Sequence, residues 1–215
     1  MPEGSVKGMY VDLRRCIGCN ACSLACKQEF FGRLDPLPVG QVWSQIYGAE
    51  DGGYPSVKIK TLPMRCQQCG EKREAPCMMK CDSLGYRAIN RRPDGIVYVD
   101  PQLCVGCQQC LYPVCPYNAM AFNTEKVNKL GTKGVAEKCN FCMERLDQGL
   151  LPACVITCLG VTLDFGDYEA LKAKHAAAGP KKMGNKGKVL YGHLGGAPKR
   201  PTNGYPNPVP FHLDD

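Results

Sequence analysis

Long apolar runs are missing from this sequence of 215 residues. A helix that crosses a bilayer needs about 20 mostly apolar residues in succession, but the most apolar segment, 150–163, is interrupted by one proline and two cysteines. A secretory or twin-arginine signal needs an apolar stretch after its positive charges, and none follows Arg14 and Arg15. We therefore expect no direct membrane span and no signal peptide.

Histidine and the common catalytic motifs are scarce as well. The sequence has three histidines. It has no Gly-rich nucleotide fingerprint after a strand, no Walker loop, and no Ser-His-Asp or Cys-His arrangement that exceeds chance. We therefore predict that the chain is not an enzyme on its own.

Cysteine, in contrast, is abundant, and all sixteen cysteines fall into four groups of four. Group one is Cys16, Cys19, Cys22 and Cys26; group two is Cys66, Cys69, Cys77 and Cys81; group three is Cys104, Cys107, Cys110 and Cys115; group four is Cys139, Cys142, Cys154 and Cys158. The three histidines lie outside these groups. The thiols therefore dominate the metal-binding chemistry that this sequence can offer.

The four groups repeat in the order A, B, A′, B′. Groups one and three share Cys-x2-Cys-x2-Cys and the flanks "GMYVDLRRCIGC" and "IVYVDPQLCVGC", whereas groups two and four share a looser form that ends in Cys-x3-Cys. Group three begins 88 residues after group one, and group four begins 73 residues after group two. Duplication of one two-motif unit is the simplest explanation.

Three cysteines at x2 intervals allow one loop to wrap a metal cube, and a glycine such as Gly18 or Gly106 permits close backbone approach or a positive φ. Cys22 and Cys26 lie four residues apart, so on a helix they share one face about 5.4 Å apart. The fourth thiol can then serve a neighbouring cluster, as in two-cluster ferredoxins. The spacing predicts four [4Fe-4S] clusters in two pairs.

Two other uses of the cysteines are less consistent with the pattern. Eight disulfides would need an oxidising compartment, and nothing in the sequence directs the chain to one. Structural zinc also uses Cys-x2-Cys pairs, but three thiols within seven residues suit a cube face better than one tetrahedral ion, and zinc sites usually include histidine. A zinc-stabilised interaction module remains the remote alternative.

The net charge of +7 counts every thiol as neutral and would otherwise suggest a nucleic-acid partner. Four oxidised clusters with their thiolates carry about −2 each, which brings the total to roughly −1. We therefore expect no nucleic-acid partner, because the excess lysine and arginine compensates buried anions.

With these motifs the sequence resembles the iron-sulfur electron-transfer subunits, often called B subunits, of the dimethyl sulfoxide reductase family of molybdenum or tungsten enzymes. The resemblance covers about residues 8–166, and "KCNFCMERLDQGLLPACVITC" is especially similar to the family's fourth motif. It implies four ligand sets. Set one is Cys16, Cys19, Cys22 and Cys158; set two is Cys26, Cys139, Cys142 and Cys154; set three is Cys66, Cys69, Cys77 and Cys115; set four is Cys81, Cys104, Cys107 and Cys110.

The sequence departs from the family pattern at three points. Cys81 and Cys158 lack the proline that usually follows a fourth ligand, group three ends in Cys-x4-Cys, and group two contains x7 where x4 is common. Because all sixteen cysteines are present, we do not predict a lost cluster.

The predicted fold is α+β: two fused ferredoxin-like units of the bacterial 2[4Fe-4S] type, related by internal duplication, loop-rich, with short strands and helices and an extended C-terminal arm. One unit comprises residues 1–60 and 132–166 with groups one and four, and the other comprises 61–131 with groups two and three. Residues 167–215 are predicted to form a helix, a short strand and a Pro/Gly-rich partner-binding tail.

Local patterns predict several of these elements. The alternating runs "MYVD", "IVYVD", "AMAF" and "VTLDF" predict strands, and "RRPDG" at 91–95 predicts a turn that joins two of them. The segment "DYEALKAKHAAAG" predicts a helix that Asp167 caps and that stops at Gly179, and "KVLYG" predicts a strand.

Three basic residues beside the cysteines and one tryptophan between groups one and two have two interpretations each. Arg15, Arg65 and Lys138 directly precede the first cysteine of a group, so each is either a base that stabilises a reduced cluster or a solvated base. Trp43, the one tryptophan, is interpreted as a packing or interface residue rather than an electron relay.

The resemblance implies an electron-transfer subunit of a heteromeric oxidoreductase in anaerobic respiration. It would relay single electrons between a larger Mo- or W-pterin catalytic subunit and a donor or acceptor, either a membrane-anchored quinone-reactive subunit or a soluble redox partner. The alternative is a free-standing polyferredoxin. The protein would be cytoplasmic, or periplasmic by co-export with a partner that carries a signal.

Overall fold

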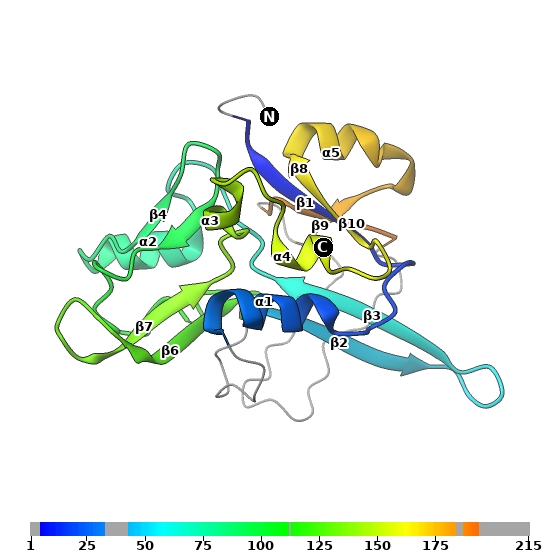
Figure 1. Ribbon diagram of the computed structural model, residues 1–215, viewed down its shortest axis with the longest axis horizontal. Helices are drawn as coiled ribbons and strands as arrows, with labels where there is room; N and C mark the ends of the chain where they lie inside the picture. Colours follow the sequence, from blue (N-terminus) through cyan, green and yellow to red (C-terminus); the bar gives the residue numbers. More distant parts are fainter. Residues whose placement is uncertain (1–4, 33–42, 112, 184–186, 194–215) are drawn as a thin grey trace.

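The computed structural model describes residues 5–32, 43–111, 113–183 and 187–193 (Figure 1). These residues form small β-sheets and short helices, so the predicted mixture of short strands and helices is confirmed. The predicted C-terminal arm from residue 194 onward lies outside the described residues. None of the described helices is long and apolar enough to cross a membrane.

A four-stranded sheet brings the two ends of the described chain together. Its order is β8 (Leu163–Asp167), β1 (Lys7–Asp12), β10 (Val189–Gly192) and β9 (Lys181–Lys182). β1 is antiparallel to β8 and parallel to β10, with Met9 opposite Val189. This confirms the predicted strands "MYVD" and "KVLYG".

One predicted strand begins later than expected. The run "VTLDF" starts at residue 161, but β8 starts at Leu163. Val161 has a φ of +47°, and the N–H of Thr162 donates to the Sγ of Cys158 at 3.2 Å. Val161 therefore belongs to the cysteine loop, and Thr162 joins that loop to the sheet, because its carbonyl oxygen accepts from the N–H of Asp12 in β1 at 2.9 Å.

The helix α1 (Ala21–Phe31) carries the end of group one. It begins after Asn20 and ends at Gly32, both in the left-handed region, and Cys22 and Cys26 are its buried residues. It packs against α4 (Ala153–Ile156), and Glu29 pairs with Arg145 of α3 (Met143–Leu146) at 3.1 Å. The shared face predicted for Cys22 and Cys26 is confirmed.

A long hairpin, β2 (Ser44–Asp51) with β3 (Lys58–Arg65), was not predicted. Its base is buried from Leu62 to Arg65, and its tip is exposed. Figure 1 shows the tip extending away from the body of the molecule. The hairpin therefore delivers Arg65 and Cys66 into the interior from one end.

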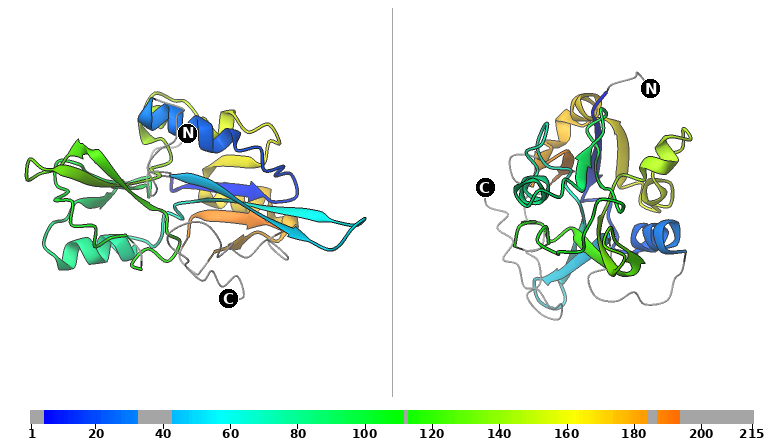
Figure 2. Two further views of the ribbon diagram at one scale, coloured as in Figure 1. Left: turned by 90° about the horizontal axis from the view of Figure 1, so that it is seen from below. Right: turned by 90° about the vertical axis from the view of Figure 1, so that its left-hand side faces the viewer.

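The middle of the chain forms a separate cluster of elements. It contains α2 (Pro76–Ser83), the hairpin β4 (Ile89–Arg91) with β5 (Val97–Val99), and the hairpin β6 (Met120–Val127) with β7 (Lys133–Lys138). Residues 92–96 join β4 and β5, which confirms the predicted turn near 91–95, and β6 includes most of the predicted strand "AMAF". Figure 2 shows these elements together at one end of the molecule.

Two principal cores accompany this arrangement, and both contain cysteines. One combines residues from both ends of the chain with residues of the β2–β3 hairpin and Ile96, and it includes Met9, Cys22, Leu62, Cys154 and Tyr191. The other is drawn from the middle and includes the following residues: Cys77, Met78, Cys81, Ile89, Val97, Cys104, Cys110, Met120 and Val135. The unit boundaries stay a prediction, and β7 contributes Val135 to the second core.

The helix α5 (Tyr168–Lys174) covers the four-stranded sheet. The side chain of Asp167 accepts a hydrogen bond from the N–H of Ala170 at 2.8 Å, which confirms the predicted cap. A short 3-10 turn, Ala176–Ala178, follows and ends at Gly179 in the left-handed region. The helix is shorter than predicted because this tighter turn replaces its last part.

Candidate metal centres

The cysteine loops of groups one to three share an alternation of backbone φ angles, whereas group four has two consecutive positive φ angles. In group one the residues two and four positions after Cys16 are Gly18 (φ +72°) and Asn20 (φ +59°). The corresponding pairs are Gln68 (φ +51°) with Gly70 (φ +74°) in group two and Gly106 (φ +71°) with Gln108 (φ +58°) in group three; group four has Phe141 and Cys142, both at +55°. Such alternation turns successive N–H groups toward one side and forms a concavity that suits anions and Fe–S centres.

The positive φ predicted at Gly18 and Gly106 is therefore confirmed. The corresponding conformation at Gln68 and Gln108 was missed because glutamine carries no local signal for it. Asn20 could have been found, since asparagine tolerates the left-handed region better than most residues.

Four thiols of the middle region surround one cavity. Cys66, Cys69, Cys77 and Cys115 line it, and it encloses about 350 Å³ of empty space, its opening included. Burial raises the pKa of Cys77 to about 12. The cavity wall also includes Lys138. Group two, through three of its members, and the last cysteine of group three therefore meet in space.

A second cavity of about 360 Å³, its opening included, has four other thiols in its wall: Cys81, Cys104, Cys107 and Cys110. Its remaining lining is mostly apolar and includes Leu84, Ile89 and Val99. The last cysteine of group two thus joins the first three of group three. The irregular x7 and x4 spacings do not keep these thiols apart.

Four more thiols converge where α1 meets the loops of group four. Burial raises the pKa of Cys26, and the neighbouring thiols of Cys139, Cys154 and Cys142 raise it further. Cys26 and Cys139 also contact one small cluster with Trp43 and Ala121. Burial raises the pKa of Cys139 to about 12, with Cys66 and Cys154 acting in the same direction.

The remaining thiols lie around the start of α1. Cys22 belongs to the first core, and Cys158 packs against that core. The loop of Cys16 lies beside the loop of Cys158. The two are so close that a Cβ on Gly160 would come within 2.4 Å of the carbonyl oxygen of Arg15. Cys16 is half-buried and Cys19 is exposed.

The fourth cysteines of groups two, three and four accept backbone hydrogen bonds. The Sγ atoms of Cys81, Cys115 and Cys158 accept from the N–H groups of Ala88 at 3.2 Å, Ala119 at 3.3 Å and Thr162 at 3.2 Å. Burial acts to raise the pKa of Cys158, but the hydrogen bonds from Thr162 and its neighbours lower it overall. Such donors favour a thiolate and help to set the electronic properties of a metal that it binds.

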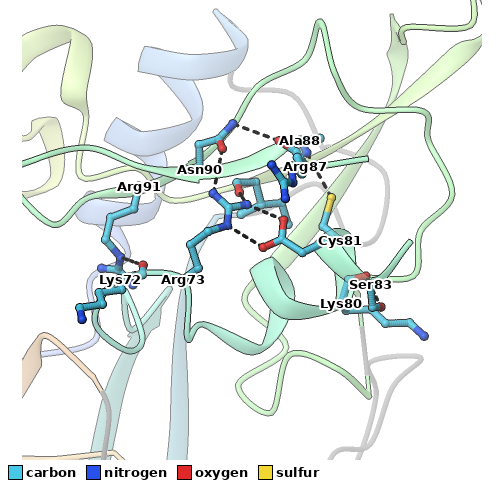
Figure 3. A network of polar contacts seen from close by, with 11 residues as sticks. Lys72, Arg73, Lys80, Cys81, Ser83, Arg87, Ala88, Asn90 and Arg91 are labelled. Atoms are coloured by element: carbon cyan, nitrogen blue, oxygen red, sulfur yellow. Dashed lines mark hydrogen bonds and ion pairs between the residues drawn. The ribbon is translucent and has the colours of Figure 1, made fainter. Parts of the chain in front are cut away.

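Figure 3 shows the polar network that supports Cys81. Arg73 holds Asp82 of α2 through two hydrogen bonds, one of them from Nε at 2.6 Å, and Nη2 also donates to the carbonyl of Ile89 at 3.1 Å. The side chain of Asn90 accepts from Arg73 at 3.3 Å. These contacts fix α2 against β4 and hence fix the position of Cys81.

We expect Asp82→Asn to lower the free energy of unfolding by about 1 kcal/mol at pH 7, because it weakens a charge-assisted pair with Arg73. The loss is no larger because solvent partly screens this pair. The hydrogen bond from Arg73 lowers the pKa of Asp82. A lowered pKa gives stability that is complete above the unfolded value of about 4 and is lost as the pH falls through the folded value. Denaturant unfolding should be measured between pH 8 and pH 3. The difference in free energy of unfolding between the parent and Asp82→Asn should stay constant down to about pH 4 and become smaller below it.

The control for this substitution is Glu169→Gln, which neutralises a carboxylate in an exposed pair with Lys172. We expect it to have no measurable effect. An Asp82→Asn protein as stable as the parent at pH 7 would show that the Arg73 contacts do not hold α2.

The basic residues that precede the cysteines differ in exposure. Arg15 is exposed, which fits the interpretation of a solvated base. Arg65 and Lys138 are 2% and 3% exposed and lie among thiols. Trp43 packs against Phe30, with ring centroids 4.1 Å apart, as the packing interpretation predicts.

The thiols line cavities that are larger than the site of a single metal ion. Among the described residues, no three Cys, His, Asp or Glu side chains could hold one metal ion. The two cavities each have four thiols in their walls, mostly apolar linings, and an amide donor to Cys81 or Cys115. This donor set suits thiolate-bound iron-sulfur clusters.

Comparison with known proteins agrees with this chemistry. The family model described as a 4Fe-4S dicluster domain matches residues 57–168. The sequence is 38% identical over 172 residues to the B subunit of the tetrathionate reductase of Salmonella typhimurium, a match that covers 78% of this chain and 61% of the relative. It is 33% identical over 172 residues to the B subunit of the anaerobic dimethyl sulfoxide reductase of Escherichia coli, covering 78% and 77%.

This protein belongs to the iron-sulfur B subunits of the dimethyl sulfoxide reductase family. Another B subunit of this family, from the selenate reductase of Mesobacillus selenatarsenatis, is 34% identical over 185 residues, covering 74% of this chain and 59% of the relative. The chain thus spans about 60% of the length of the tetrathionate and selenate relatives. As a member of this family, it carries multiple [4Fe-4S] clusters.

Proposed function

We propose that this chain holds four [4Fe-4S] clusters through sets one to four and relays single electrons to or from a larger Mo- or W-pterin catalytic subunit. The observation that carries this proposal is the pair of cavities, because each is walled by the four thiols of one set. Bound clusters would supply one-electron transfer. The protein residues bind the clusters, exclude water from them and direct N–H groups at their sulfur ligands.

The exposure of the thiols supports a relay with two ends. All sixteen cysteines lie in the described residues, and two of them, Cys19 and Cys107, are exposed. Cys19 belongs to set one and Cys107 to set four, whereas sets two and three consist of buried or half-buried thiols. Electrons could therefore enter and leave at the outer sets while the inner sets stay insulated.

The same proposal includes the two-unit organisation. The alternating positive φ angles recur after Cys16, Cys66 and Cys104, which supports duplication of a loop that was already shaped for a cluster. The second core, drawn from residues 75–120 with Val135 and Ala136 of β7, supports a middle unit close to the predicted 61–131, and the predicted partner unit is 1–60 with 132–166. In this organisation each unit holds two sets.

The partner and compartment follow from the family rather than from the site. The relatives are named as subunits or chains of reductases, which favours a permanent heteromer over a free-standing polyferredoxin. Catalysis would then lie on the larger subunit. The second partner would be a membrane-anchored quinone-reactive subunit or a soluble carrier, and the complex would be cytoplasmic or exported with a partner that carries a signal.

The decisive experiment is measurement of iron and acid-labile sulfide on anaerobically purified protein, with an electron paramagnetic resonance redox titration of the same sample. We expect about sixteen of each per chain and several interacting one-electron signals. About twelve of each would show that one set does not bind a cluster and would overturn the four-cluster proposal. Little iron with about four zinc would overturn the electron-transfer function itself.

A further inference from the structure

Two buried cations lie where the two cores meet. Arg65 ends β3 and Lys138 ends β7, and they are 2% and 3% exposed. Among the described residues, no carboxylate forms an ion pair with either side chain. A buried charge without a partner is costly, so the thiols around these cations are their source of compensation.

Arg65 does not face the set to which its neighbour in sequence belongs. It directly precedes Cys66 of set three, but its Nη1 lies 3.5 Å from the Sγ of Cys154 of set two and donates to the Sδ of Met9 at 2.9 Å. The thiols of Cys22 and Cys139 also interact with its charge. The guanidinium therefore lies against set two, on the side of set one.

Lys138 shows the reverse arrangement. It directly precedes Cys139 of set two, but its side chain lines the cavity of set three. Its ammonium donates to the carbonyl oxygens of Val97 and Cys139, the second at 2.9 Å. Each cation thus comes from the loop of one inner set and faces the other.

Arg65 has features that a purely structural arginine lacks. Its Nε and Nη2 are buried and have no hydrogen-bond partner, although buried polar groups are nearly always paired. Arg91 provides the contrast, because its three nitrogens donate to the carbonyls of Lys72, Gly95 and Cys69. Arg91 holds loops together, whereas Arg65 leaves Nε and Nη2 unpaired and places Nη1 beside the sulfur atoms of Met9 and Cys154.

We infer that Arg65 and Lys138 are a crossed pair of positioning cations that keep the two inner clusters reducible. The inference rests on the proposed ligand sets. One-electron reduction takes a cluster with its thiolates from about −2 to about −3, and burial disfavours the more negative form. Solvent offsets this cost at the outer sets, where Cys19 and Cys107 are exposed. At the inner sets the two buried cations offset it.

The test compares Arg65→Met and Lys138→Met in the full chain, with midpoint potentials from an electron paramagnetic resonance titration. Cys142→Ser and Cys69→Ser identify the signals of set two and set three. We expect Arg65→Met to lower the potential of the set-two signal and Lys138→Met that of the set-three signal. Each shift should reach about a tenfold loss in the equilibrium constant for reduction, or about 59 mV for one electron.

Arg15→Met is the matched control, because Arg15 also precedes the first cysteine of a group but is exposed, and it should shift no potential. Arg65→Lys and Lys138→Arg keep the charge and should retain most of the parental potential. If Arg65→Met loses iron while Arg65→Lys keeps it, the role of the charge is supported; equal iron loss in both would overturn it.

Two further results would overturn the inference. One is unchanged potentials in both Met variants with iron at about sixteen per chain, which leaves the proposed function standing. The other is an uncrossed pattern, in which Arg65→Met shifts the signal that Cys69→Ser identifies. Iron well below sixteen in the parent protein would instead contradict the proposed ligand sets.

Discussion

Removal of the clusters is expected to abolish cooperative unfolding of this protein. The reason lies in the second core, where four cysteines stand beside small or flexible residues such as Ala75, Ala88 and Met78. Two cavities of about 350 and 360 Å³, openings included, border this core. Because the thiols cannot close these spaces, bonds to iron and not aliphatic packing hold the region together, and metal binding becomes folding free energy.

The measurement is thermal unfolding followed by circular dichroism, before and after anaerobic removal of iron with ferricyanide and EDTA. Iron-free protein should show no sharp transition, and amide exchange should be fastest in α2 and β4–β7. Protection should last longest in β1 and β10, since Tyr10, Tyr168, Leu171 and Leu190 form a cluster without cysteine. EDTA without oxidant is the control. A sharp transition within a few degrees of the parent would contradict this dependence on metal.

Gly106→Ala should remove one cluster. Gly106 has a φ of +71°, which costs about 1–2 kcal/mol for a residue with a Cβ. A Cβ there would also lie 2.6 Å from the carbonyl oxygen of Gly134 and 2.8 Å from the Nδ2 of Asn128. The nearest atom to the new Cβ is a backbone oxygen of Gly134, which cannot rotate away as a side chain can. The loop between Cys104 and Cys107 must therefore move. We expect iron to fall from about sixteen to about twelve per chain, with loss of the set-four signal.

Gly149→Ala separates the effect of backbone strain at a positive φ from the effect of a close contact between the new Cβ and its neighbours. Gly149 has nearly the same φ, +73°, but a Cβ there meets nothing within 4 Å. It should therefore lower stability through backbone strain alone and keep every cluster. Gly18→Ala should fall between them, because its Cβ would meet the flexible Cγ2 of Thr61 at 3.0 Å. Equal iron content in Gly106→Ala and Gly149→Ala would show that the close approach to Gly134 does not matter.

The sequence predicts the features of this molecule that depend on local spacing. The shared face of Cys22 and Cys26, the cap at Asp167 and the positive φ at Gly18 and Gly106 all follow from residues within a few positions. The hairpin of β2 and β3 could not be predicted from alternating apolar and polar residues. Its residues are buried near the base of the hairpin and exposed near the tip, so burial does not alternate along the strands. Pro63 within β3 also argues against a strand on sequence grounds alone.

The neighbours of the cysteines could not be predicted in the same way. Arg65, Lys138 and Arg15 occupy the same position in their motifs, but the first two are buried and the third is exposed. Their contacts span long distances in sequence: Arg65 meets Cys154, 89 residues away, and Lys138 meets Val97, 41 residues away. Motif spacing fixes which thiols are available, but tertiary packing decides which charge faces which thiol.

The central position of β1 has a consequence for biosynthesis. β1 is completed on one side by β10, with Met9 opposite Val189, 180 residues later. At 5–20 residues per second, roughly 10–40 s pass on the ribosome before that partner exists. For most of this interval the thiols of group one are already synthesised while the sheet around β1 is incomplete. These thiols are then open to oxidants and to competing metals. The order of translation therefore favours cluster insertion in the middle of the chain first, with the thiols made earliest among the last to be sealed.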